Sequence, residues 1–293
     1  MVCNNCPRRC GAERGEFTPG GVCASPALPK IARAAPHFGE EPCISGVRGS
    51  GTVFFSGCNL RCVFCQNVQI SRGGAGKTVT ISRLRDIFLE LQDKGVHNIN
   101  LVTASHYTRP VAEALRKAKL KIPVAWNSSG YDSVEELRRL EGLVQIYMPD
   151  LKYSSSELAR RYSAAPDYPE VAKAAILEMS RQTGSFTLDQ NDMLQSGVLI
   201  RHLIMPDNEC NSREVIDFVA DNFPGDMVLF SLMSQFTPMP GTERFPELQK
   251  TVDPELNDRL IRYMCARGIE YGFWQEPEAA TGDMIPAFDL TGV

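Results

Sequence analysis

The sequence predicts an α/β fold built on a parallel sheet, either as an open (β/α)6 barrel or as a doubly wound sheet. From Gly51 onward, short β-branched and apolar runs alternate with segments of helical period, which is typical of repeated βα units. Six such repeats follow one another, two short of a closed eightfold barrel. The chain has 293 residues, of which 43% are hydrophobic, enough to bury one substantial core.

The same periods place the individual elements. Ser82 and Ser133 can each cap a helix with a hydroxyl group, and Glu136 stands at the capping-box spacing from Ser133. In both folds the loops that follow the strands meet at one functional face. Residues 189–196 and 238–245 are expected to be surface loops. The expected strands are 52–56, 99–103, 123–127, 144–150, 198–204 and 227–232, and the expected helices are 82–94, 109–118, 133–140, 169–183, 212–222 and 253–266, with a short last strand at 270–274.

The composition indicates how the chain is divided into segments and in which compartment it works. Residues 1–46 are rich in Cys, Pro, Gly and Arg, so we expect an irregular metal-binding segment there, a core at 47–275 and a tail at 276–293. The net charge of −4 gives no general reason to expect nucleic-acid binding. With no long apolar run and no signal-peptide pattern, we expect a cytoplasmic protein without membrane contact. Ten cysteines in a reducing compartment then favour metal or redox ligands over disulfides.

Three cysteines lie on one short loop after the first expected strand. Cys58, Cys62 and Cys65 have the spacing C-x3-C-x2-C, and Gly57 allows a sharp turn before them. Iron–sulfur clusters normally take four thiolates, so three would leave one iron of a cubane open for a reactant. The alternatives are a zinc loop or three structural thiols, although zinc usually takes two paired C-x2-C knuckles.

The loop at residues 56–67 resembles the defining motif of the radical S-adenosylmethionine (SAM) superfamily. The resemblance implies a partial (β/α)6 TIM-like barrel that holds a [4Fe–4S] cluster and SAM as cofactors. In that family the open iron chelates the methionine part of SAM, and one electron cleaves a C–S bond to give a 5′-deoxyadenosyl radical. Phe64 stands where the family prefers an aromatic residue against the adenine.

The resemblance extends over roughly residues 50–275 and includes the activating enzymes of glycyl radical enzymes, such as pyruvate formate-lyase activating enzyme. The chain is most similar to an uncharacterised iron–sulfur branch of these activases. The stretches that carry this similarity are 40–46, 49–55, 98–103 and 146–153.

The activases indicate which strand ends would hold the cofactor. Asp150 and Lys152 stand where a similar Asp-x-Lys contacts SAM, and alternation in a strand turns both to one face. Asn127 and Ser128 stand where activases hold a small monovalent cation, although Asn127 here replaces an acid. The alternatives are a surface ion pair for the first two residues and an ordinary turn for the others.

Two further strands carry candidates. Ser105 follows a Thr-Ala that is similar to the activases, but their Gly-Gly-Glu, which binds the SAM amino group, is missing, so Ser105 or backbone carbonyls would replace it. Arg201 lies in a buried strand, where a charge is costly unless paired, so we expect it to hold the cofactor or to pair with Asp150. His202 would face the opposite side and pack under a helix. His106, Ser234 and Gln235 are additional candidates, and no catalytic residue is assigned.

A second cysteine set lies near the N-terminus. Cys3, Cys6, Cys10 and Cys23 form C-x2-C-x3-C-x12-C, a complete ligand set for zinc or for a second, closed [4Fe–4S] cluster. Cys43 could substitute for one of them. The alternative is a loose thiol-rich segment without a metal. This alternative is disfavoured because isolated exposed thiols oxidise.

The predicted function is therefore a radical SAM oxidoreductase of anaerobic type that abstracts a hydrogen atom. By resemblance, its substrate is a glycine of a partner glycyl radical enzyme, and flavodoxin or ferredoxin supplies the electron. A peptide or a small metabolite is the alternative substrate. An iron–sulfur electron carrier or a metal-stabilised binding module is the non-enzymatic alternative, against which the missing fourth cysteine argues.

Overall fold

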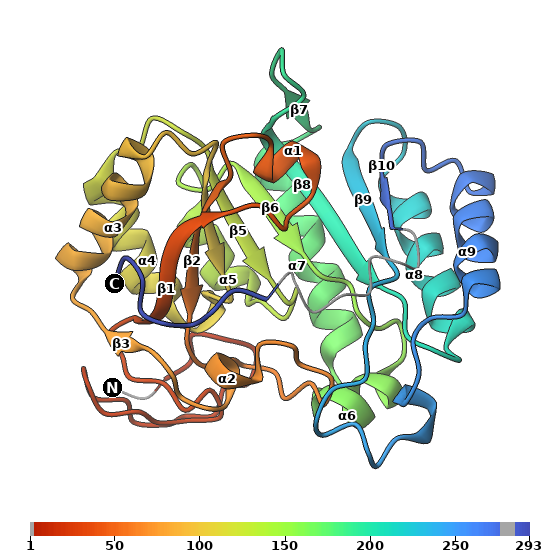
Figure 1. The fold of residues 1–293 in the computed structure, drawn as a ribbon, viewed down its shortest axis with the longest axis horizontal. Coiled ribbons are helices and arrows are strands. Elements are labelled where there is room, and N and C mark those ends of the chain that lie inside the picture. Colours follow the sequence, from red (N-terminus) through yellow and green to blue (C-terminus); the bar gives the residue numbers. More distant parts are fainter. Residues whose placement is uncertain (1–2, 276–284) are drawn as a thin grey trace.

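The computed structural model describes residues 3–275 and 285–293, and it shows a mixed α/β fold with a curved, largely parallel sheet (Figure 1). Residues 276–284 of the expected C-terminal tail lie outside the described residues. The strand order is β10-β9-β8-β6-β5-β4-β2-β1-β3, and β7 pairs with β8 alone. Among the described residues β10 and β3 stand at the two ends of this order, so the sheet does not close on itself, as expected of a partial barrel.

The six expected strands are confirmed, and each pairs in parallel with its neighbour. The short seventh strand at the end of the chain extends the same parallel series. Their bounds are β2 (Ser50–Phe55), β4 (Ile99–Val102), β5 (Val124–Ser128), β6 (Ile146–Pro149), β8 (Leu194–Leu203), β9 (Val228–Met233) and β10 (Gly272–Trp274).

The N-terminal segment is less irregular than the sequence predicts. Residues Lys30–His37 form β1, which runs antiparallel to β2 and pairs at its start with β3 (Lys77–Thr78). Further along β1, the backbone N–H of Ala34 donates to Thr291 O (2.8 Å), so the end of the chain covers this edge. β1 was missed because its Ala residues and Pro36 lack the β-branched character of a strand.

Most expected helices are confirmed, with corrected starts. Thr80, not Ser82, caps α3, because its hydroxyl accepts from the N–H of Arg83. Ser133 precedes α5 without a side-chain capping bond, and Glu136 pairs instead with Arg109 (2.9 Å). The longer helices are α3 (Ile81–Asp93), α4 (Thr108–Ala118), α7 (Tyr168–Thr183), α8 (Glu209–Asn222) and α9 (Pro254–Ala266).

The short elements fill the connections. Residues 189–196 are only partly a loop, since β7 (Thr187–Leu188) and the start of β8 form a hairpin there. Residues 238–245 lie between β9 and η3, as a loop should. The remaining short elements are α1 (Pro42–Ser45), α2 (Val68–Ser71), η1 (Ser105–Tyr107), α5 (Val134–Leu137), η2 (Arg138–Leu140), α6 (Ser156–Ser163), which was not expected, and η3 (Pro246–Leu248).

Alternation along the strands separates the largest apolar cluster of the core from two smaller ones. On β8, Val198 and Ile200 belong to the large apolar cluster shared with the helices, whereas Leu199 belongs to a smaller cluster that contains Ile44 of α1. Figure 1 shows α1 at the end of the sheet opposite to α2, which follows the cysteine loop. The interior of the barrel is thus apolar near α1, and α1 closes that end.

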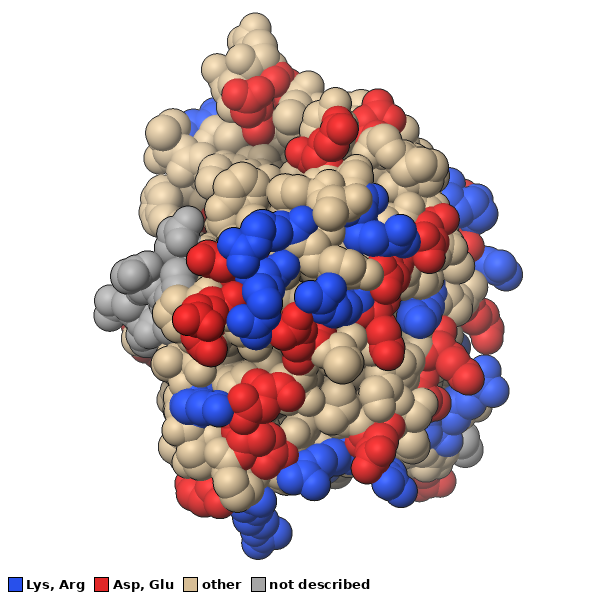
Figure 2. Space-filling view, turned by 90° about the vertical axis from the view of Figure 1, so that its right-hand side faces the viewer, with Lys and Arg blue, Asp and Glu red and all other residues tan. Residues whose placement is uncertain are grey.

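The outer surface carries both signs of charge. Figure 2 shows Lys and Arg side chains interspersed with Asp and Glu on one face. In the described part of the chain, none of the helices combines the length and the apolar character needed to cross a bilayer.

Candidate functional site

A cavity of about 260 Å³ opens inside the barrel, where the parallel strands end. Cys58, Cys62 and Cys65 line it. Six of the seven residues expected to bind the cofactor line it as well; Ser105 does not. These six are Phe64, Asn127, Ser128, Asp150, Lys152 and Arg201.

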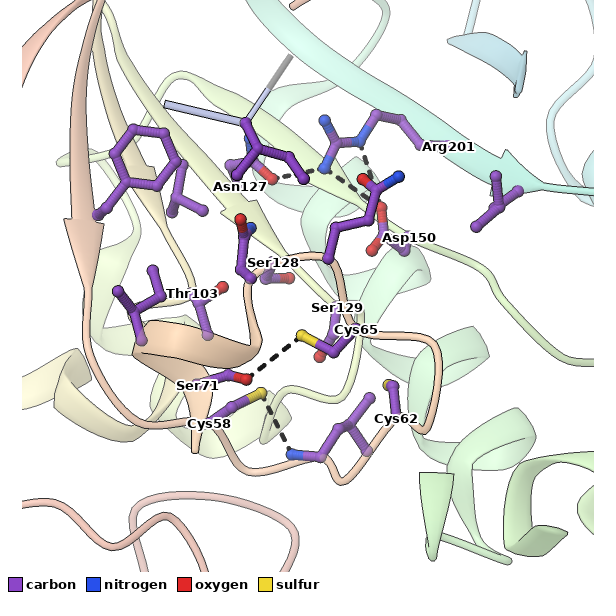
Figure 3. A pocket seen from close by; sticks show the side chains of 18 of the residues that line it. Cys58, Cys62, Cys65, Ser71, Thr103, Asn127, Ser128, Ser129, Asp150 and Arg201 are labelled. Atoms are coloured by element: carbon purple, nitrogen blue, oxygen red, sulfur yellow. Dashed lines mark hydrogen bonds and ion pairs between the residues drawn. The ribbon is translucent and has the colours of Figure 1, made fainter. Parts of the chain in front are cut away.

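The three thiols belong to the loop between β2 and α2 (Figure 3). Gly57 begins this loop with φ +84°, the left-handed region that glycine tolerates. The Sγ of Cys58 accepts from the N–H of Leu60 (3.4 Å), and the Sγ of Cys62 accepts from the hydroxyl of Ser163 (3.0 Å). The cysteine spacing and the turn at Gly57 therefore bring all three cysteines to the wall of one cavity.

Burial changes the acidity of two of these thiols. Burial raises the pKa of the Cys58 thiol to about 12, and the neighbouring Cys62 and Cys65 add to the rise. Burial also raises the pKa of Cys62, although the charge of Lys152 opposes it. Thiolates in such a place need positive compensation, which iron provides, so the chemistry of this donor set fits an iron–sulfur cluster, although the side chains as placed in the described part of the chain do not form a closed metal site. Among the described residues, no group of three or more His, Cys, Asp or Glu side chains is arranged to hold a metal ion.

Opposite charges meet at the ends of β6 and β8. Arg201 contacts Oδ1 of Asp150 (3.2 Å), and Lys152 Nζ contacts Oδ2 of the same carboxylate. Burial alone would raise the pKa of Asp150, but the charges of Lys152 and Arg201 outweigh it and hold the pKa below its usual value. The expected pairing of Arg201 with Asp150 and the common direction of Asp150 and Lys152 are both present.

Asn127 and Ser128, at the end of β5, are already engaged. The Oδ1 of Asn127 accepts from Nη2 of Arg201 (2.6 Å). The hydroxyl of Ser128 donates to Asp132 and accepts from the N–H of Gly130 (3.1 Å). Asp132 was not predicted; it is buried and its pKa is raised by that burial.

Most of the remaining candidates do not line the cavity. Ser105 is buried in η1 beside Asp132. His106 is buried, with Nε2 2.9 Å from Ser56 O. His202 faces away from the cavity, as expected, with Nδ1 2.6 Å from Leu151 O and Nε2 2.9 Å from the Ser212 hydroxyl of α8. Of the last pair, Gln235 lines the cavity, whereas Ser234 bonds to Gln275 O.

Thr103 and Glu40 also line the cavity; they lie in stretches 98–103 and 40–46, which carry the family similarity, but no role was predicted for them. Thr103 follows β4 with φ +61°, an uncommon conformation for a β-branched residue and one often found at functional sites. Glu40 comes from the segment before α1 and pairs with Arg201. No local pattern identifies Glu40, because its partners lie far away in the chain.

The four N-terminal thiols gather around Cys6. Burial raises the pKa of Cys6 to about 11, and Cys23, Cys3 and Cys10 each add to the rise. The set packs against the cysteine loop of the barrel: Arg8 Nε donates to Asn59 O (2.7 Å). Cys43 is separate, buried in α1 within the apolar interior.

Comparisons with known proteins agree with this geometry. Residues 52–189 match the family model of the radical SAM superfamily. An uncharacterized protein of Methanocaldococcus jannaschii is 28% identical over 235 residues, which is 77% of this chain. The chain spans only 64% of the length of that relative.

Solved structures give the same fold. Streptococcus suis SuiB bound to SAM matches with a TM-score of 0.51 and 14% identity, over 79% of this chain and 51% of SuiB. SuiB bound to its precursor peptide SuiA matches with a TM-score of 0.51 and 17% identity, over 75% and 46% of the two chains. A domain of pyruvate-formate lyase-activating enzyme from Bacteroides vulgatus matches at 0.43 and 13%, over 58% and 91%, too weakly to carry an argument. The match over residues 52–189 therefore relates this part of the chain to the radical SAM superfamily, whose members use a [4Fe–4S] cluster and SAM.

Proposed function

We propose that this protein cleaves SAM reductively at a [4Fe–4S] cluster held by Cys58, Cys62 and Cys65. The 5′-deoxyadenosyl radical would then abstract a hydrogen atom from a glycine of a partner protein. The observation that carries this proposal is that the three thiols share one cavity with the buried ion pairs of Asp150. When bound, the cluster supplies the single electron that the cleavage needs.

The residues around the thiols would bind and orient SAM. Asp150 and Lys152 offer a carboxylate and an ammonium group to its polar parts, and Arg201 fixes the carboxylate from behind. Phe64 lines the cavity as an aromatic face for the adenine, packed on Phe236 at 5.8 Å between ring centres. Ser128 would be held in place by Asp132. Ser105 would then act through Asp132 rather than touch the amino group of SAM.

The glycine substrate and an electron donor of the flavodoxin or ferredoxin class follow from the resemblance to activases. A peptide or a small metabolite is the alternative substrate. The missing Gly-Gly-Glu favours keeping this alternative, because the chain departs there from the activase pattern.

Anaerobic incubation of the reconstituted protein with SAM and dithionite tests the activity. We expect release of 5′-deoxyadenosine; no release from protein with an intact cluster would instead support an electron carrier. Deuterated candidate substrates, with deuterium read in the released 5′-deoxyadenosine, identify the hydrogen donor. A glycyl doublet in the electron paramagnetic resonance spectrum of a partner would support the activase assignment over a metabolite.

We also propose that Cys3, Cys6, Cys10 and Cys23 hold a second metal, either zinc or a closed [4Fe–4S] cluster. The mutual influence of the four thiols supports it. The small local core supports it as well. Phe17 is exposed, whereas the thiols of Cys6 and Cys23 are buried, so metal–thiolate bonds would stabilise the segment.

A further inference from the structure

The segment Glu40–Gly46 forms a fixed plug at the end of the barrel opposite to the cysteine loop (Figure 1). Pro42 begins α1, and Ile44 packs into the apolar interior. Gly46 ends the helix with φ +46°, and a Cβ there would lie 2.7 Å from His97 Nε2. The backbone on both sides of Glu41 is therefore held in place, and it fixes where Glu40 enters the barrel.

Glu40 reaches from this plug to three strands. Its Oε1 accepts from Nδ2 of Asn100 on β4 (3.0 Å) and from Nδ2 of Asn127 on β5 (3.1 Å). Its Oε2 pairs with Nη1 of Arg201 on β8 (3.0 Å). Only 10% of the Glu40 side chain and 13% of the Arg201 side chain are exposed, so solvent does little to weaken this pair.

The contacts close into a ring. Asn127 donates to Glu40 through Nδ2 and accepts from Arg201 through Oδ1 (2.6 Å). Glu40 and Arg201 together determine which way the amide of Asn127 points. Arg201 forms ion pairs with Glu40 on one side and with Asp150 on the other. Without Glu40, Arg201 would lose its direct ion pair on this side and keep only Asp150 as an ion-pair partner, with the charge of Glu41 nearby.

We propose that Glu40 is a positioning residue that holds Arg201 and Asn127 in the orientation in which they, with Asp150, face the SAM cavity. This inference rests on the proposed binding of SAM in that cavity. It also assigns a role to the stretch Glu40–Gly46: this plug places the carboxylate of Glu40 in contact with the binding residues. Carboxylates that orient metal ligands change affinity or activity by about 10–100-fold on removal, and we expect an effect of the same order for a carboxylate that orients SAM-binding groups.

Equilibrium binding of SAM to the reconstituted protein tests it. Glu40→Gln keeps the size of the side chain but removes its charge, and we expect the dissociation constant for SAM to rise on the order of 10-fold with iron and sulfide content unchanged. Glu113→Gln is the matched control, because Glu113 is exposed and pairs only with Lys117 on the surface of α4. Wild-type affinity in Glu40→Gln would overturn the proposal.

Glu40→Asp separates geometry from charge. It keeps the negative charge, so Arg201 stays neutralised and the barrel should fold, but the shorter side chain cannot reach all three partners. We expect weakened SAM binding here too, and wild-type affinity would show that charge alone matters, against the proposal.

A double-mutant cycle gives a result that a purely structural role of Glu40 would not produce. Because Glu40 acts through Asn127, Glu40→Gln with Asn127→Ala should weaken SAM binding by less than the product of the two single effects. Independent effects would contradict positioning through Asn127. If the wild-type protein itself binds no SAM, the proposed function fails, which differs from the failure of Glu40 alone.

Discussion

Arg201 on β8 and Asp150 at the end of β6 are joined across neighbouring strands, with Nη2 3.2 Å from Oδ1. The pair is largely buried, and Lys152 occupies the other oxygen of the carboxylate. Asp150 thus contacts both bases at the wall of the cavity, while Glu40 pairs with Arg201 from the other side. This shared compensation makes Asp150 the residue on which the charge balance of the site depends most.

Asp150→Asn should therefore weaken both folding and SAM binding. Removing one partner of a buried ion pair leaves a charge uncompensated, so we expect the free energy of unfolding to fall by about 3 kcal/mol. Denaturant unfolding measures the change, with Glu113→Gln as the control, since an exposed pair contributes about 0.5 kcal/mol or less. Equal losses in the two variants would refute the importance of burial.

Cys62→Ala should lose the barrel cluster and all release of 5′-deoxyadenosine. Cys43→Ala is the matched control, because Cys43 is also buried but lies in α1, away from the cavity. Iron and sulfide analysis and chromatography of the products measure both variants. Continued cleavage of SAM by Cys62→Ala would show that the ligands are assigned wrongly.

Local patterns predicted the six parallel strands because each is a compact apolar run. They also predicted the common face of Asp150 and Lys152, since strand alternation is local. The patterns could not predict Glu40 or β1, whose partners are distant in the chain and whose own residues do not look like a strand or a site. Asp132 was missed for a related reason: its role comes from Ser128 and Trp126, which only the folded turn brings to it.

His202 should make stability depend on pH. Burial lowers its pKa to about 4 from 6.5, and its ring is bonded to Leu151 O and to the Ser212 hydroxyl. Between pH 6.5 and 4 the unfolded chain binds a proton that the folded chain refuses. The free energy of unfolding should thus fall by about 3 kcal/mol as the pH drops through this window, and the contribution of His202 should stop changing below it.

Unfolding of wild-type protein and His202→Asn at several pH values measures this contribution. The variant should show a shallower slope between pH 6.5 and 4. Some slope should persist, because burial also lowers the pKa of His106, to about 3. Identical slopes would mean that His202 does not titrate as its burial implies.

The N-terminal thiols should account for metal beyond the barrel cluster. Cys10 is exposed, so Cys10→Ser should leave the core intact while it removes one ligand of the second site. Metal analysis should show a loss of zinc, or of about four iron atoms for a closed cubane, relative to wild type. Cys265→Ser, also at an exposed cysteine, should lose nothing. A wild-type protein with only the barrel iron and no zinc would exclude the second site.

Gly57 should tolerate no side chain, because a substitution there would cause both backbone strain and steric overlap. Gly57 and Gly95 have similar backbone angles, with φ +84° and +77°, so alanine at either position costs about 1 kcal/mol in backbone strain. A Cβ at Gly95 would meet nothing within 4 Å, whereas at Gly57 it would lie 1.9 Å from Ser25 Oγ and 2.7 Å from Cys23 O. We expect Gly57→Ala to lose a further 1–3 kcal/mol or so through this overlap.

The two glycine variants also test whether the N-terminal segment braces the cysteine loop. Because Cys58 follows Gly57 directly, relief of the overlap should displace the loop, and reconstituted Gly57→Ala should bind less iron than Gly95→Ala. Thermal unfolding and iron content together separate the two effects. If both variants lose equal stability and retain equal iron, the contact of Ser25 and Cys23 with Gly57 does not constrain the loop, and the cysteines are held by the barrel alone.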